Sequence, residues 1–444
     1  MTQGSPVQLL LVFALPLMAG NVFQQLYTVT DTAIVGRALG VTGLAALGAV
    51  DWLNWCVLGV IQGITQGFSI LIAQKFGAGE YREMRRTVGN ASVLSAAGAL
   101  FLLIITQLAE NPVLRLLQTP QEIFPMASIY LRIMFCGIPV IMTYNMVSAV
   151  LRALGDSRTP LYAMVLASVT NICLDMLFVL VFGWGVQGAA AATILAQILS
   201  ALYCIRAVMK IEILKLSRDD ITPEGALSRK LLYLGAPMAF QNAIIAVGGM
   251  FVQTVVNGVG VIFIAGFTAT NKLYGLLEVA ATSYGYAMTT YTGQNLGAGN
   301  IRRISDGIRA GMMIAMITSV IITVSMFVFG RWILGWFITE SGEAGKQALE
   351  IAFVYLKIMS ICLPALYTLH IFRSSIQGMG NTVIPMISGF AEFFVRTISC
   401  IVIPVLFGAA GIMFAEVLAW SGADLILIPG YFYVKNKVKN IVHT

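Results

Sequence analysis

Two carboxyl groups inside long apolar runs are the residues best placed to do chemistry. Asp31 lies in the run over residues 9–35, and Asp175 lies in the run over residues 161–182. Asn171 precedes Asp175 by four residues, so a helix places both on one face. A carboxylate and an amide oxygen can bind an alkali cation, and two close carboxyl groups can instead hold a proton. The sequence leaves these two alternatives open.

The apolar runs that contain these acids determine the class of protein. The chain has 444 residues, of which 58% are hydrophobic and 11% charged, whereas soluble domains carry about 25% charged residues. The runs are long enough to cross a hydrocarbon layer of about 30 Å as helices. We therefore predict an all-α integral membrane protein. A carboxylate in such a layer costs several kcal/mol unless it faces protein or water, so both acids are expected to be functional.

Proline, glycine and polar clusters divide the runs into predicted spans. Basic residues gather in alternate connections, so both termini are expected to be cytoplasmic and the number of spans even. The net charge of +7 is explained by these loops, and we expect no nucleic-acid partner. The twelve predicted spans are residues 9–35, 44–73, 88–108, 127–150, 161–182, 188–208, 231–256, 261–292, 308–329, 351–374, 383–407 and 411–432.

The two halves of the chain repeat each other at an offset of about 220 to 225 residues. Gln-Lys-Phe-Gly-Ala-Gly at 74–79 recurs as Gln-Asn-Leu-Gly-Ala-Gly at 294–299, and the loop 154–160 matches 379–385. Matching loops fall on the same side of the membrane, which predicts two six-helix bundles related by a pseudo-two-fold axis along the membrane normal. The predicted domains are a first bundle over 1–209, a cytoplasmic linker over 210–229, a second bundle over 230–434 and a basic tail over 435–444.

These paired motifs, together with Pro16 and Asp31 in the first span, resemble the multidrug and toxic compound extrusion (MATE) family, in its DNA-damage-inducible-F-like branch. The resemblance implies export of organic, often cationic, compounds in exchange for H⁺ or Na⁺, without a cofactor and without a metal other than a bound Na⁺. It also implies a bend of the first helix at Pro16. The cation-site residues of that branch map onto Asp31, Asn171, Asp175 and Thr193.

The repeat does not duplicate this acid cluster. The counterpart of Asp175 in the second half is Cys400, and the counterpart of Asn171 is Arg396. The asymmetry favours a specialised site in the first bundle.

Other polar residues of the spans are candidates for the walls of a substrate cavity. Glu392 and Arg396 are four apart and predict an intrahelical ion pair. His370 stands alone in its span and is interpreted as a packed histidine. The substrate-cavity candidates are Gln24, Tyr27, Tyr144, Asn145, Gln241, Glu278, Glu392 and Arg396.

Two other functions compete with export. A flippase for lipid-linked precursors uses the same architecture in the wider superfamily, but it would need a more cationic cavity for pyrophosphate headgroups. An enzyme is not expected, because the sequence lacks a His-Glu-x-x-His motif, a Ser/His set and a phosphate-binding glycine loop. We expect a monomer in a bacterial or archaeal plasma membrane that acts on small organic substrates.

Overall fold

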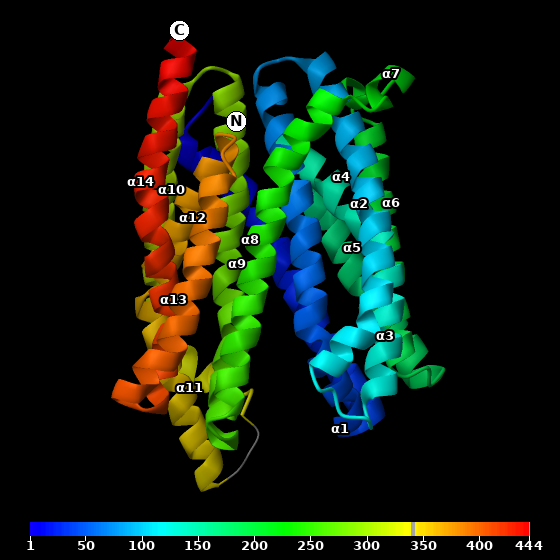
Figure 1. Ribbon diagram of the computed structural model, residues 1–444, viewed down its shortest axis with the longest axis vertical. Coiled ribbons are helices and arrows are strands. Elements are labelled where there is room, and N and C mark those ends of the chain that lie inside the picture. Colours follow the sequence, from blue (N-terminus) through cyan, green and yellow to red (C-terminus); the bar gives the residue numbers. More distant parts are fainter. Residues whose placement is uncertain (339–341, 444) are drawn as a thin grey trace. The chain divides into compact units, whose positions relative to one another are not determined.

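The computed structural model describes residues 1–338 and 342–443, in which the regular secondary structure is helical and no strand occurs. Figure 1 shows long helices running side by side within each half. In the first half the elements are α1 (Pro6–Gly77), α2 (Tyr81–Leu116), α3 (Phe124–Cys136), α4 (Ile138–Ala153), α5 (Arg158–Asp175), η1 (Met176–Val181), α6 (Val186–Met209), η2 (Glu212–Leu214) and α7 (Arg218–Ile221). The second half contains α8 (Gly225–Asn257), α9 (Val261–Gly297), α10 (Ile301–Leu334), α11 (Glu343–Ile361), α12 (Leu363–Gly378), α13 (Val383–Phe407), η3 (Ala409–Phe414) and α14 (Ala415–His443).

The first long helix is two spans joined at a kink. At Gly40 the backbone takes φ 66° and ψ −154°, a conformation that is not helical. Glycine reaches positive φ without the steric cost that a Cβ imposes. The two parts, Pro6–Gly40 and Thr42–Gly77, are each long and apolar enough to cross a membrane.

Two further spans are bent pairs of helices, and their positions match across the repeat. The pairs α3–α4 and α11–α12 each bend by 47°. Pro139 and Pro364 lie in the first turn after the bend, where a missing backbone N–H costs little. The same bend therefore occurs at repeat-related positions.

The predicted number of spans agrees with the helices. Among the described residues nine helical segments are long and apolar enough to cross a membrane, and the two bent pairs raise this to eleven. Helix α9 has 37 residues and is long enough for the twelfth span, although it does not pass the same test of composition. The chain is thus a multi-pass membrane protein of six spans in each half.

Contacts divide the chain into two compact units. The first unit is Leu15–Ala239, and the second unit combines Met1–Ala14 with Phe240–Thr444. The start of the chain belongs with the second half because Arg303 of α10 donates to the backbone carbonyl of Gly4, at 3.0 Å. The bundle boundaries predicted from sequence follow chain order and remain predictions.

Small residues allow close helix packing inside the first unit. A Cβ added at Gly67 of α1 would lie 2.4 Å from the Cα of Gly235 in α8, whereas one added at Gly48 would have no heavy atom within 4 Å. In a membrane, where lipid is as apolar as a side chain, helix association depends on such close packing.

The connection after α6 is pinned to the first unit. Ser217 and Asp220 form a capping box on α7, and Asp220 lies 3.8 Å from the Arg85 guanidinium of α2. Asn90 of α2 accepts a hydrogen bond from the Glu224 backbone N–H at 2.8 Å. The predicted linker is therefore a short docked segment with no core of its own.

Asp220 should hold this linker in place over most of the pH range. Desolvation acts to raise its pKa, but hydrogen bonds from Ser217 and the charges of Arg85 and Arg86 outweigh it and lower the pKa below the usual value. Because the pKa of Asp220 is lower in the folded state than in the unfolded state, its charge stabilises docking at pH values above the unfolded-state pKa. This stabilisation is lost as the pH falls through the folded-state pKa. We expect Asp220→Asn to speed amide hydrogen exchange of residues 210–229 from pH 8 to about pH 5, with the difference from wild type shrinking below about pH 4 as the pH falls through the lowered pKa of Asp220. The control is Asp219→Asn, which changes an exposed neighbour. Equal rates of amide hydrogen exchange in the two variants would contradict a docking role for Asp220.

Gly67→Ala should lower the melting temperature of the detergent-purified protein. The added methyl group cannot fit without moving α8, at a cost of about 1–3 kcal/mol for an overpacked contact. Gly48→Ala is the matched control and should leave the melting temperature unchanged or slightly higher. Equal melting temperatures for the two variants would show that the contact at Gly67 does not limit stability.

Candidate functional site

The two predicted acids lie together inside the first unit. Asp31 on α1 is 8% exposed, and Asp175 at the end of α5 is fully buried. Their carboxyl groups are close enough to interact with each other. Helices α1 and α5 therefore present acids to a common point, as their sequence positions suggested.

Asn171 and Thr193 complete the predicted set. Asn171 lies one turn before Asp175 on α5 and is 1% exposed. Its side-chain amide donates to the Thr193 hydroxyl of α6 at 3.3 Å. The structure thus brings the four predicted residues of α1, α5 and α6 into one cluster.

The cluster contains more acceptors than donors. Asp31 Oδ1, Asn171 Oδ1 and both carboxylate oxygens of Asp175 are buried and have no hydrogen-bond partner among the described residues. Buried oxygens are nearly always paired, because an unpaired one costs about 1–3 kcal/mol. Four such oxygens in one place fit a bound cation or a shared proton.

A narrow crevice opens beside the cluster. It is lined by Tyr27 together with Asn171 and Thr193, and it is too narrow to admit a water-sized sphere. Gln24 lies one turn before Tyr27 and interacts with its hydroxyl group. In this conformation the crevice has no room for an organic molecule.

Three polar residues of this region were not predicted. Gln197 lines the crevice one turn after Thr193, and its Oε1 is buried without a partner among the described residues. The charge of Asp51, in the second part of α1, acts on Asp31, and Tyr130 of α3 lies within reach of both acids. Asp51 meets the criterion that selected Asp31, a carboxyl group within an apolar run. Gln197 could have been found from its spacing of four from Thr193.

The backbone changes form directly after Asp175. Residues Met176–Val181 continue α5 as a π-helix, a form that is rare and often found at functional sites. The wider turn redirects the side chains that follow the acid. The helix as a whole, Arg158–Val181, still qualifies as one span.

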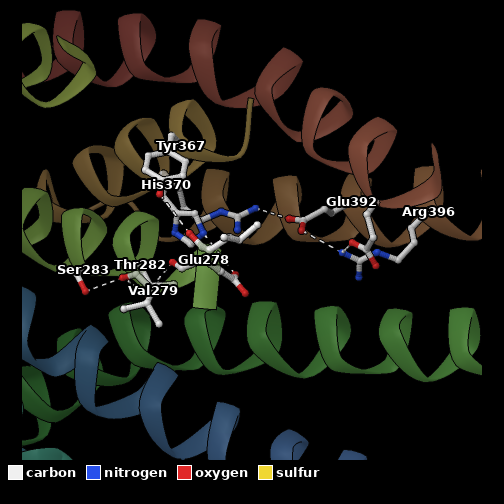
Figure 2. A network of polar contacts seen from close by, with 11 residues as sticks. Glu278, Val279, Thr282, Ser283, Tyr367, His370, Glu392 and Arg396 are labelled. Carbon is white, nitrogen blue, oxygen red and sulfur yellow. Dashed lines mark hydrogen bonds and ion pairs between the residues drawn. The ribbon is translucent and has the colours of Figure 1, made fainter. Parts of the chain in front are cut away.

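Several substrate-cavity candidates of the second unit form an ionic network, which Figure 2 shows from close by. Glu392 and Arg396 of α13 make the predicted intrahelical ion pair at 3.4 Å. Glu278 of α9 lies 3.7 Å from His370 Nε2 of α12, so the histidine that was interpreted as a packing residue faces a carboxylate.

The remaining candidates are buried or locally bonded. Tyr144 is 7% exposed and packs in a small cluster with Leu151 and Cys204. The Asn145 amide donates to the backbone carbonyl of Ile141, at 2.8 Å. Gln241 is buried in the second unit and accepts a hydrogen bond from Gln377 at 3.4 Å. The role of these three residues in substrate binding remains a prediction.

Pro16 lies within α1, immediately after the point where the helix passes from the second unit to the first. Proline removes one backbone hydrogen bond inside a helix and permits a bend there. The position therefore suits a hinge.

A duplicated bundle of membrane spans with buried, unpaired acids defines a polytopic membrane transporter. The chain belongs to the MatE family, whose sequence profile matches residues 16–177 and 237–402, one stretch in each half. Related proteins carry names that refer to multidrug resistance or multidrug export.

Curated relatives and a solved structure agree with this assignment. The chain is 33% identical over 367 residues to the probable multidrug resistance protein YpnP of Bacillus subtilis, covering 80% of each chain. It is 26% identical to the probable multidrug resistance protein NorM of Thermotoga maritima, over 94% of this chain and 89% of the other. A crystal structure of a MATE protein in complex with MaL6 superposes with a TM-score of 0.90 at 21% identity, covering 100% of this chain and 98% of that one, which supports the fold.

Proposed function

We propose that this protein is a secondary active exporter of organic, often cationic, compounds, driven by exchange for H⁺ or Na⁺ through alternating access. The names of the relatives YpnP and NorM support multidrug export. The observation that carries the coupling proposal is the group of four buried oxygens without partners on Asp31, Asn171 and Asp175.

The donor set suits either coupling ion. Carboxylate, amide and hydroxyl oxygens are the hard ligands that alkali cations prefer, and Asp31, Asn171, Asp175 and Thr193 would hold Na⁺. For H⁺, the two close carboxyl groups would share one proton, because both cannot easily ionise side by side. In both cases the bound cation removes the repulsion between Asp31 and Asp175.

Coupling follows if cation occupancy changes which state the first unit prefers. A ligand shifts a conformational equilibrium only by its difference in affinity for the two states. Neutralising the pair of acids would allow α1 and α5 to approach, whereas ionised acids would push them apart. Pro16 gives α1 a place to bend in response. The substrate and the cation would then favour opposite conformations, so the binding of one would promote the release of the other. Transport by this cycle is an exchange of substrate for cation.

A flippase for lipid-linked pyrophosphates is a weaker candidate. Such a headgroup needs cations that are free to bind it. Of the three basic residues expected within the spans, Lys272, Arg373 and Arg396, the two arginines are buried and already paired with Glu392 in the second unit. This arrangement favours export over flipping.

The expected setting is a bacterial or archaeal plasma membrane, with a monomeric protein whose two termini are cytoplasmic. The basic residues of alternate loops support this orientation through the positive-inside rule. The bilayer and small organic substrates are the expected partners.

Asp31→Asn and Asp175→Asn should each reduce gradient-driven export of a fluorescent organic cation such as ethidium by about tenfold or more, since a typical coupling free energy corresponds to factors of about 5–150. An amide keeps the shape of the side chain but loses the charge that distinguishes the cation-bound state. Binding of the same probe, measured by fluorescence polarisation, should change less than export does.

The control for this experiment is Glu122→Gln, an acid in an exposed turn of the first unit. All variants are reconstituted at equal density in proteoliposomes. Normal export by both aspartate variants would rule out coupling at this cluster.

A further inference from the structure

A recess lies between α2 and α4 of the first unit, two helices that pack against each other (Figure 1). Its volume is about 310 Å³, near the lower end of the range for small-molecule sites, about 300–1,000 Å³. The crevice of the acid cluster, in contrast, admits no water-sized sphere. Helix α2 lines the recess with small side chains, among them Ser92, Ser95 and Ala96, and α4 lines it with Met142 and Met146.

The recess follows from the pattern of small residues on α2. Ser92, Ser95 and Ala96 are three and four residues apart, so they share one helix face. Small side chains on one face usually let the helices of a membrane bundle approach closely. Here Met142 and Met146 of α4 border the space instead of filling it. Because methionine is flexible, this wall can adapt to a ligand.

One hydroxyl group in the wall of the recess lacks a partner. Ser92 donates to the backbone carbonyl of Val88 at 2.8 Å. Thr143, which also lines the recess, makes the same kind of bond to Pro139 at 2.7 Å. Ser95 is 4% exposed, and its Oγ has no hydrogen-bond partner among the described residues. A buried hydroxyl without a partner is costly, so Ser95 is the group that a ligand would satisfy.

The recess opens on the apolar face of α2. Leu100, which lines it, is 57% exposed, and Ile104 and Leu108 continue the same face with 52% and 74% exposed. The helix is long and apolar enough to cross a membrane, so an exposed stripe of this kind faces acyl chains. A ligand therefore enters from the bilayer. The described residues that line the recess carry no charge, so the ligand is uncharged as well.

We propose that this recess is a binding site for an uncharged organic molecule that dissolves in the bilayer and carries a hydroxyl or carbonyl group. The polar group pairs with Ser95, and the apolar body lies against Ala96, Met142 and Met146. A cavity of about 150 Å³ holds benzene. The recess therefore suits a body of one substituted ring or two fused rings.

An acyl chain of a membrane lipid is the alternative occupant. It fills an apolar groove, but it has no polar group at this depth of the membrane. With an acyl chain in the recess, the Ser95 hydroxyl would stay without a partner. The buried hydroxyl therefore favours the ligand with a polar group.

The second half of the chain does not repeat this lining. The offset that aligns the paired glycine motifs matches α2 with α10. The counterpart of Ser95 on α10 is Ala315, which has no hydroxyl group. The counterparts of two further small lining residues are the larger Met312 and Met316. The recess is thus a feature of the first half and not a general consequence of the fold.

The site lies apart from the acid cluster on α1, α5 and α6. Neither α2 nor α4 contributes one of the four residues of that cluster. The site goes beyond the proposed function, so its test measures binding and requires no export.

Photolabelling of the protein in proteoliposomes tests the site. The probe is propofol, an uncharged phenol with two isopropyl groups, together with a photoreactive diazirine derivative of it. We expect peptides of α2 and α4 to carry the label and unlabelled propofol to displace it. Diisopropylbenzene has the same shape without the hydroxyl group. It should need about threefold or more higher concentration in the lipid, since one neutral hydrogen bond changes affinity by a factor of roughly two to ten.

Three variants make the result specific. Ser95→Ala should make the two compounds equally effective, and diisopropylbenzene should still displace the label as in the wild type, which shows that the recess is intact. The matched control is Ser92→Ala, because Ser92 lines the same recess but already bonds to Val88. Its preference for propofol should persist. Ala96→Phe fills the recess and should abolish the labelling.

The proposal is overturned if the label does not map to α2 and α4. It is also overturned if the wild type binds propofol and diisopropylbenzene equally well, which would identify a groove for acyl chains. A loss of preference in Ser92→Ala as large as that in Ser95→Ala would contradict the role of Ser95.

Discussion

A carboxyl group inside a membrane-spanning bundle must be compensated, and the polar interior of this protein is organised around that requirement. Water cannot solvate Asp31 or Asp175, which are 8% and 0% exposed. Arginine, the usual partner of a buried acid, is absent from the described surroundings of this pair. Four oxygens of this cluster therefore stay without a hydrogen-bond partner among the described residues. We propose that cation binding at this cluster links an ion gradient to the conformation of the bundle.

The two units meet the same requirement in different ways. In the first unit, amide and hydroxyl groups on α5 and α6 surround the acids, and Asn171 bonds to Thr193 at 3.3 Å. In the second unit, Arg396 joins Glu392 to Glu416, and His370 faces the Glu278 carboxylate at 3.7 Å. The duplicated backbone, with its two bends of 47°, is shared. The two halves thus share a backbone architecture but differ in their charged residues.

Much of this could be predicted from sequence because the signals are local or repeated. The apolar runs predict the membrane spans, and the paired motifs predict that the chain consists of two similar halves. The pair Glu392–Arg396 follows from a spacing of four on one helix. Asp31 and Asp175 stand out because acids are rare in such runs.

The remaining features depend on how helices pack, which no local pattern encodes. The contact between Glu278 and His370 joins α9 to α12, so the histidine looked like a packing residue. Glu416 becomes a partner of Arg396 only when α13 meets α14. The docked linker likewise depends on Asn90 of α2, which is far from it in sequence.

The most direct test of the central claim is export from proteoliposomes under separately imposed proton and sodium gradients. With no ATP present, we expect an inward gradient of one of these ions to accelerate export of an organic cation and that ion to move in the opposite direction. Asp31→Asn protein should show neither effect. Export that proceeds at the same rate with and without both gradients would contradict the account.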